Sequence, residues 1–164
     1  MNKYDLTDIE KMTFESENIP EFDYKREKNS YRLTEAQRRD MPNDENNLTT
    51  LRIKMCNYFG LILNGNSKLL EANCLILPNT FHKVMSCDNK RNVTYDLLCK
   101  FCIGLGLSEE QARELFSLMG YEITAAKKAD YILLHYLNCD EGILDYARDM
   151  IDYCHEKPSK YGLE

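Results

Sequence analysis

Apolar residues recur at steps of one, three and four between residues 93 and 105, and this spacing places them in a single stripe along a helix. The stripe consists of Val93, Leu97, Leu98, Phe101, Cys102 and Leu105. Two glycines, Gly104 and Gly106, follow in the last turn and loosen the end of the helix. The pattern therefore predicts a helix that buries one side in the middle of the chain.

A second helix is predicted directly after the first, because residues 108–111 have the sequence of a capping box. The hydroxyl of Ser108 can accept a hydrogen bond from the amide three residues later, and the Gln111 side chain can bond back to the Ser108 amide. The apolar stripe continues through residues 112–119. Gly120 then stands where a left-handed C-terminal cap is expected.

Three helical segments are predicted before this pair. Residues 49–64 read as a first core helix, and residues 67–74 as a short helix after a Gly-Asn turn. Residues 75–77 form the next turn. Pro78 is suited to the first position of a further helix, residues 78–86, because its missing amide hydrogen is not needed there.

Two helices are predicted after Gly120, one over residues 129–138 and a last one that starts at residues 140–142 and runs to about residue 152. His135 lies among apolar neighbours in the first of these and is expected to pack in the core. The core side of the last helix is predicted to carry Leu144, Ala147 and Ile151. Its opposite side is predicted to expose a row of carboxylates to water: Asp145, Asp149 and Asp152.

The first 48 residues contain few apolar side chains, so this segment cannot fold alone. One interpretation is an arm that lies over the helical part of the chain or is partly mobile. The other is that the arm binds a partner through aromatic anchors, of which Phe14, Phe22 and Tyr24 are the candidates. Residues 155–164 are expected to form a mobile tail.

Residues 49–154 resemble a lambda-repressor-like (Cro-type, XRE-like) helix-turn-helix domain. The segments that carry the resemblance are YDLLCKFCIGLGLS, SEEQARELFSLMGY and KKADYILLHYLNCDEGILDYARDMID. The resemblance implies that residues 67–74 and 78–86 are the two helices of the motif. The chain departs from the family in the turn, where Leu75, Ile76 and Leu77 replace a segment that usually contains glycine.

The resemblance also implies that residues 78–86 form the recognition helix, with Phe81 and Val84 facing inward. The residues then expected to reach DNA are Asn79, Thr80, His82 and Lys83 on the helix, and Lys90 and Arg91 on the following loop. The predicted fold is all-α: a compact bundle of about six to seven helices with a helix-turn-helix-like core. Its predicted parts are an N-terminal acidic arm (1–48), the helical domain (49–154) and the tail (155–164).

The net charge of −6 is unevenly distributed. Residues 1–48 hold 8 basic and 12 acidic side chains, a balance of −4, and residues 125–164 hold 5 and 8, a balance of −3. Residues 49–124 hold 8 and 7, a balance of +1. Because phosphate contacts supply much of the affinity for DNA, a nearly neutral centre with acidic flanks also favours a basic protein as the partner.

Seven cysteines in 164 residues are an odd number, and most lie within apolar stripes, which is typical of a reducing compartment. Cys99 and Cys102 have the spacing of a metal-binding pair, but they lie within a predicted helix and no second pair exists. No metal or cofactor is therefore expected. The chain has no apolar run of membrane-spanning length and no secretory signal at its N-terminus, so a cytoplasmic location is expected.

The sequence contains no nucleophile motif and no phosphate-binding glycine loop, and its three histidines lie in separate elements. We therefore expect neither catalysis nor a small-molecule substrate. Two functions remain. One is a regulator that binds duplex DNA, with a homodimer interface supplied by the C-terminal helices or the arm. The alternative is an acidic interaction module or inhibitor, such as a phage or mobile-element protein that blocks a host defence nucleoprotein complex.

Overall fold

The computed structural model describes residues 2–15, 44–86 and 93–154. Over these residues the chain forms a short 3-10 helix and seven α-helices, and the described residues contain no strand. This confirms the predicted all-α fold. The elements are η1 (Ile9–Lys11), α3 (Asp44–Leu63), α4 (Ser67–Cys74), α5 (Pro78–Ser86), α6 (Tyr95–Leu105), α7 (Glu109–Leu118), α8 (Lys128–Leu137) and α9 (Ile143–Cys154).

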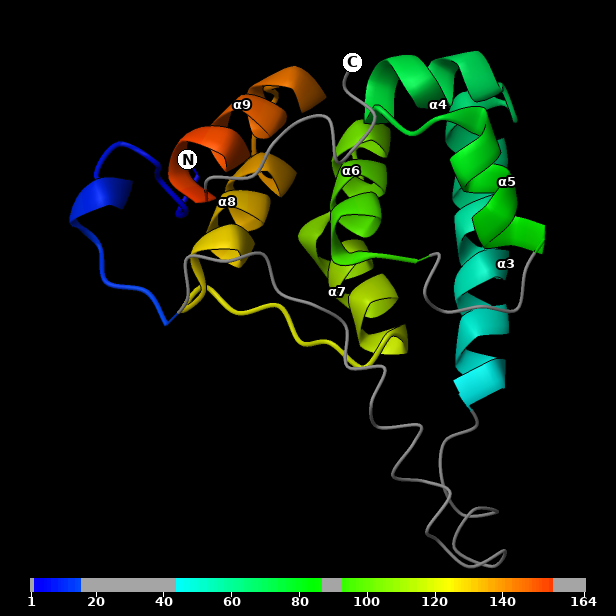
Figure 1. The fold of residues 1–164 in the computed structure, drawn as a ribbon, viewed down its shortest axis with the longest axis horizontal. Helices are drawn as coiled ribbons and strands as arrows, with labels where there is room; N and C mark the ends of the chain where they lie inside the picture. Colours follow the sequence, from blue (N-terminus) through cyan, green and yellow to red (C-terminus); the bar gives the residue numbers. More distant parts are fainter. Residues whose placement is uncertain (1, 16–43, 87–92, 155–164) are drawn as a thin grey trace, which may run out of the picture.

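Helix α6 is the centre of the fold. Every one of its residues except Gly104 is buried, and it packs against α3, α4, α7, α8 and α9. Figure 1 shows α3 and α5 on one side of α6, and α8 and α9 on the other. A helix in that position is buried on nearly all sides, so its apolar surface is wider than the single stripe predicted for residues 93–105, and its two charged residues, Asp96 and Lys100, are buried as well.

The helix ends predicted at Gly106, Ser108 and Gly120 are confirmed. Gly106 ends α6 at a positive φ of 68°. The start of α6 was not predicted in detail: Thr94 caps it by accepting a hydrogen bond from the Leu97 amide at 3.1 Å. Both hydrogen bonds of the predicted capping box are present at the start of α7, between Ser108 and Gln111. Gly120 has a φ of 72°, as its predicted role as a cap requires.

A buried carboxylate joins α6, α8 and the segment between α7 and α8. Asp130 accepts hydrogen bonds from the hydroxyls of Tyr95 at 2.6 Å and Tyr121 at 2.8 Å, and from the Thr124 amide at 2.9 Å. Burial raises the pKa of Asp130 even though these three donors favour its charged form. The network satisfies a polar group that would otherwise cost free energy at this depth.

Residues 2–15 lie against α8, as the blue segment in Figure 1 shows. Ile9 is fully buried, and the Tyr131 hydroxyl donates to the Asp5 carbonyl at 2.9 Å. The Glu15 amide donates to the Ala126 carbonyl at 2.8 Å. This part of the predicted arm is therefore packed on the helical domain. At the other end of the arm, α3 begins at Asp44, inside the segment predicted to precede the first core helix.

Candidate nucleic-acid interface

Helices α4 and α5 form the two-helix unit that the sequence predicts. Asn66 caps α4 by accepting a hydrogen bond from the Lys68 amide at 3.0 Å. At the other end of α4, Leu75 adopts the left-handed conformation, with φ 56° and ψ 33°. The expected turn therefore exists, and a leucine takes the conformation for which glycine is usually required. The residues of the unit that face the core are Leu70, Cys74, Ile76, Phe81 and Val84.

A buried ion pair on α6 contacts the left-handed turn at Leu75. The Lys100 ammonium donates to the carbonyl of Leu75 at 3.3 Å and lies 3.1 Å from the Asp96 carboxylate. Both charged side chains are almost completely buried. Burial lowers the pKa of Lys100, while Asp96 opposes that shift. Because Leu75 follows the last residue of α4, the Lys100 cation also interacts favourably with the negative end of the α4 dipole.

The outer side of α5 is polar, as predicted. Asn79, Thr80, His82 and Lys83 are all exposed, whereas Phe81 is buried between Phe59 and Phe101, with ring centroids 5.0 Å and 6.1 Å away. Three aromatic rings therefore fix the rotation of α5 about its axis. The two remaining residues predicted to contact DNA, Lys90 and Arg91, lie outside the described residues.

The positive charge available around α5 depends on which neighbouring cations are already paired. Lys54 on α3 forms an ion pair with Glu114 at 2.6 Å, which joins α3 to α7. Lys68 at the start of α4 is exposed, as is Lys83. Exposed Glu71 lies on the same short helix as Lys68 and offsets part of its charge. The described part of this surface is therefore only weakly basic.

The acidic row predicted on the last helix is wrong in one of its three members. Asp149 is only 9% exposed and accepts a hydrogen bond from the Tyr136 hydroxyl on α8. Asp152 is exposed, and Asp145 is partly exposed with its carboxylate 3.2 Å from Arg148. Asp149 therefore joins α8 to α9 and is not part of an acidic surface.

The register of α9 also differs from the predicted one by a single position. The side of α9 that faces the core carries Ile143, Tyr146, Ala147, Met150 and Cys154. Leu144, predicted to be buried, is 69% exposed. The reason is that Tyr146 packs fully into the core and brings Ile143 and Met150 with it, since these lie three and four residues away on the same side.

Of the three aromatic anchors predicted in the arm, the structure describes only Phe14. Phe14 is half-buried, and its ring lies 5.5 Å from that of Tyr131 on α8, so it makes an intramolecular contact. Phe22 and Tyr24 lie outside the described residues. Phe14 therefore helps to pack the arm on α8.

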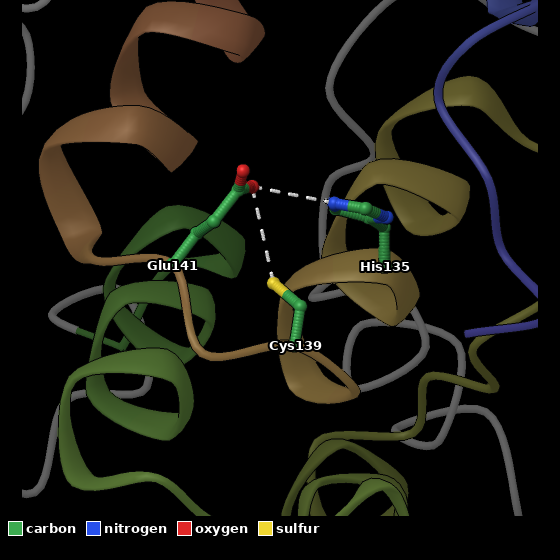
Figure 2. A group of neighbouring side chains, drawn as sticks. All are labelled: His135, Cys139 and Glu141. Carbon is green, nitrogen blue, oxygen red and sulfur yellow. Dashed lines mark hydrogen bonds and ion pairs between the residues drawn. The ribbon is translucent and has the colours of Figure 1, made fainter. Parts of the chain in front are cut away.

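A group of three potential metal ligands, which the sequence analysis did not predict, lies where α8 ends (Figure 2). It consists of His135, Cys139 and Glu141, whose ligand atoms lie within 4.8 Å of one another. His135 was expected to be a core residue and is half-buried at the edge of the core. The short separation of His135, Cys139 and Glu141 along the sequence was the available signal, although Cys139 and Glu141 both follow the end of α8.

The pair Cys99 and Cys102 is buried within α6, and burial raises the pKa of both thiols. These cysteines therefore pack as small apolar side chains, as predicted. Among the described helices, none has both the length and the apolar content that crossing a bilayer requires. Comparisons with protein-family models, with curated proteins and with solved structures gave no match.

Proposed function

We propose that this chain is a helix-turn-helix DNA-binding regulator that reads duplex DNA with α5. The observation that supports this best is the unit formed by α4, the left-handed Leu75 and α5, which buries one side of both helices and leaves the polar side of α5 exposed. In this motif the second helix enters the major groove, and residues near its N-terminus contact base edges. Asn79 and Thr80 occupy that position here.

The side chains on the outer surface of α5 are chemically suited to this role. Asn79 can form a two-point hydrogen bond with adenine, and the Thr80 methyl and hydroxyl can contact thymine or a phosphate. On this proposal His82 and Lys83, further along the helix, contact the phosphate backbone of the DNA. Each phosphate neutralised contributes a slope of about −0.9 to the dependence of log affinity on log salt, so a surface with few cations predicts a shallow salt dependence.

The proposal is tested by fluorescence anisotropy with the full chain and a labelled duplex at low salt. We expect binding that weakens as salt is added, and we expect Lys83→Ala to weaken it for every duplex and to reduce the salt slope by about 1. Lys11→Ala is the matched control, because Lys11 is an exposed lysine in the segment beside α8, on the opposite side of the molecule from α5. If Lys11→Ala weakens binding as much as Lys83→Ala, α5 is not the reading helix.

An acidic protein-interaction module or inhibitor is the second candidate function. The supporting observation is that exposed Leu144 lies next to Asp145 on α9, so that an apolar contact adjoins negative charge. A basic partner protein would bind here faster at low salt. Pull-down of such a partner that is lost with Asp145→Asn and Asp152→Asn, but retained with Lys83→Ala, would favour this function over DNA binding.

A further inference from the structure

Three side chains with different ligand atoms converge between α8 and α9. His135 comes from the last turn of α8, and Cys139 and Glu141 from the short connection that follows (Figure 2). The Glu141 carboxylate lies 3.4 Å from Nε2 of His135 and 4.0 Å from Sγ of Cys139. An imidazole, a thiol and a carboxylate in one group are a combination that transition metals bind.

The orientation of the His135 ring is fixed by the N-terminal segment. Its Nδ1 lies 2.7 Å from the Tyr4 carbonyl oxygen, which can only accept, and 3.1 Å from the side-chain nitrogen of Asn2, which can only donate. The shorter of these two contacts requires a hydrogen on Nδ1, so Nδ1 donates to the Tyr4 carbonyl. Asn2 supports this arrangement: its side chain accepts from the Tyr4 amide and donates to the His135 carbonyl. Nε2 of the neutral ring therefore presents its lone pair to Glu141. Histidines that bind metals usually have their other ring nitrogen bonded to a carbonyl or carboxylate in this way.

Two of the three separations between ligand atoms are close to those of a tetrahedral zinc site. The third, between Nε2 of His135 and Sγ of Cys139, is at most 4.8 Å and must shorten to about 3.6 Å when the ion binds. With Zn–N and Zn–O bonds of about 2.1 Å and a Zn–S bond of about 2.3 Å, tetrahedral angles require separations of about 3.4 Å between N and O and about 3.6 Å between S and O. The first equals the distance between His135 and Glu141, and the second is slightly shorter than the distance between Cys139 and Glu141. The Glu141 side chain is 54% exposed and can make that small adjustment.

The charge around the group also favours a cation. The Glu141 carboxylate lies 4.0 Å from the Cys139 sulfur, and the carboxylates of Asp140 and Asp145 are close enough to act on it. The thiol therefore lies in a negative local field. The contact between Nε2 of His135 and the Glu141 carboxylate is an ion pair only when the ring is protonated. A metal ion between the two atoms would bond to both of them.

We propose that His135, Cys139 and Glu141 bind a zinc ion. The ion takes the lone pair of Nε2, one carboxylate oxygen and the Cys139 thiolate, and the thiol proton is released to solvent. Three protein ligands leave the fourth position of the tetrahedron for water or for an external ligand. Cys139 and Glu141 also line a cavity of about 460 Å³ between the C-terminal ends of α6 and α8, so an external ligand has room beside the ion.

The zinc ion would also stabilise the contact between the N-terminal segment and α8. The ring that binds the metal is the same ring that donates to the Tyr4 carbonyl, and fixing its Nε2 fixes that hydrogen bond. Residues 2–15 would then be held more firmly when zinc is bound. This consequence is independent of whether α5 binds DNA.

The test uses the full chain, stripped of metal with a chelator and titrated with zinc chloride by calorimetry. We expect one equivalent to bind with release of one proton, counted by repeating the titration in buffers of different ionisation enthalpy. Cobalt(II) chloride should give the thiolate charge-transfer band and the intense visible bands of a tetrahedral site. Zinc should also slow amide hydrogen exchange in residues 2–15.

The variants that test the site are Cys139→Ser and Glu141→Gln, because neither changes the hydrogen bonds between His135 and the N-terminal segment. Loss of a group that only hydrogen-bonds to a metal ligand typically weakens metal affinity by a factor of about 10–100. Because Cys139 and Glu141 are proposed to bind the ion directly, each substitution should weaken zinc affinity by more than that factor. Cys139→Ser should also abolish the charge-transfer band. The matched controls are Cys56→Ser on α3 and His82→Ala on α5, an exposed thiol and an exposed imidazole, which should bind as the natural chain does.

Two results would overturn the proposal. The first is the absence of a zinc-binding heat and of a cobalt charge-transfer band, which would make the contact a plain ion pair between protonated His135 and Glu141. The second is zinc binding that is unchanged in Cys139→Ser and in Glu141→Gln, which would place the metal elsewhere in the chain.

Discussion

Replacing Gly104 with alanine tests the packing that positions the helix-turn-helix unit. Gly104 lies in α6 where this helix meets the C-terminal end of α4. A Cβ atom added there would lie 2.3 Å from Sγ of Cys74, 2.5 Å from the carbonyl oxygen of Asn73 and 2.8 Å from Cα of Cys74. Two of these three atoms belong to the backbone, so α4 and α6 would have to move apart.

Two opposing effects set the size of the change in stability. Alanine is favoured over glycine inside a helix by about 1 kcal/mol. Overpacking a core costs about 1–3 kcal/mol, and contacts with rigid backbone fall at the upper end of that range. The net expectation is a loss of about 2 kcal/mol in the free energy of unfolding. At about 2–4 °C per kcal/mol for a chain of this size, the melting temperature should fall by about 4–8 °C.

The measurement is chemical and thermal denaturation followed by circular dichroism, with Gly60→Ala as the matched control. Gly60 lies within α3, and an added Cβ there would have no neighbour within 4 Å. The control should therefore show only the helix preference and gain about 1 kcal/mol. If Gly104→Ala is stabilised as much as Gly60→Ala, then α4 and α6 are not in contact at this point and the described packing is wrong.

Three further substitutions test single interactions, each by the denaturation midpoint. Lys100→Met removes the cation from the buried carboxylate of Asp96 and from the turn, and should cost about 3–5 kcal/mol; a loss below about 1 kcal/mol would mean that the pair is exposed to water. Tyr136→Phe removes the donor to buried Asp149 and should cost about 1–3 kcal/mol, whereas an exposed Asp149 predicts almost no change. Ser108→Ala should cost about 1 kcal/mol through the lost cap of α7, and Ser108→Asp, which keeps an acceptor, should not.

The parts of the fold that the sequence predicted correctly depend on residues close together in the chain. The capping box at Ser108 and the cap at Gly120 are each specified within four residues. The apolar stripe of α6 is specified within 13 residues, from 93 to 105. Local rules of this kind need no knowledge of neighbouring helices, which is why the number, type and order of the helices could be predicted.

The errors arose where a second helix decides the outcome. Residues 143–154 offer two apolar sides with helical spacing, one through Leu144 and one through Tyr146. The second is the buried side because the Tyr136 hydroxyl on α8 bonds to Asp149, and the Tyr136 ring packs against Tyr146 with centroids 5.7 Å apart. No rule applied to α9 alone could choose between the two. The group formed by His135, Cys139 and Glu141 was likewise hidden, because Cys139 and Glu141 both follow the end of α8.

The same reasoning explains how a leucine can occupy the left-handed turn of the candidate DNA-binding unit. A side chain in that conformation costs about 1–2 kcal/mol relative to glycine, so the fold must supply contacts that hold it. Helix α6 supplies two of them one turn apart: Lys100 bonds to the Leu75 carbonyl, and Gly104 allows α4 to approach closely just before it. The angle between α4 and α5 is therefore fixed by α6. It follows that Gly104→Ala should weaken DNA binding together with stability, whereas Lys83→Ala should weaken DNA binding alone.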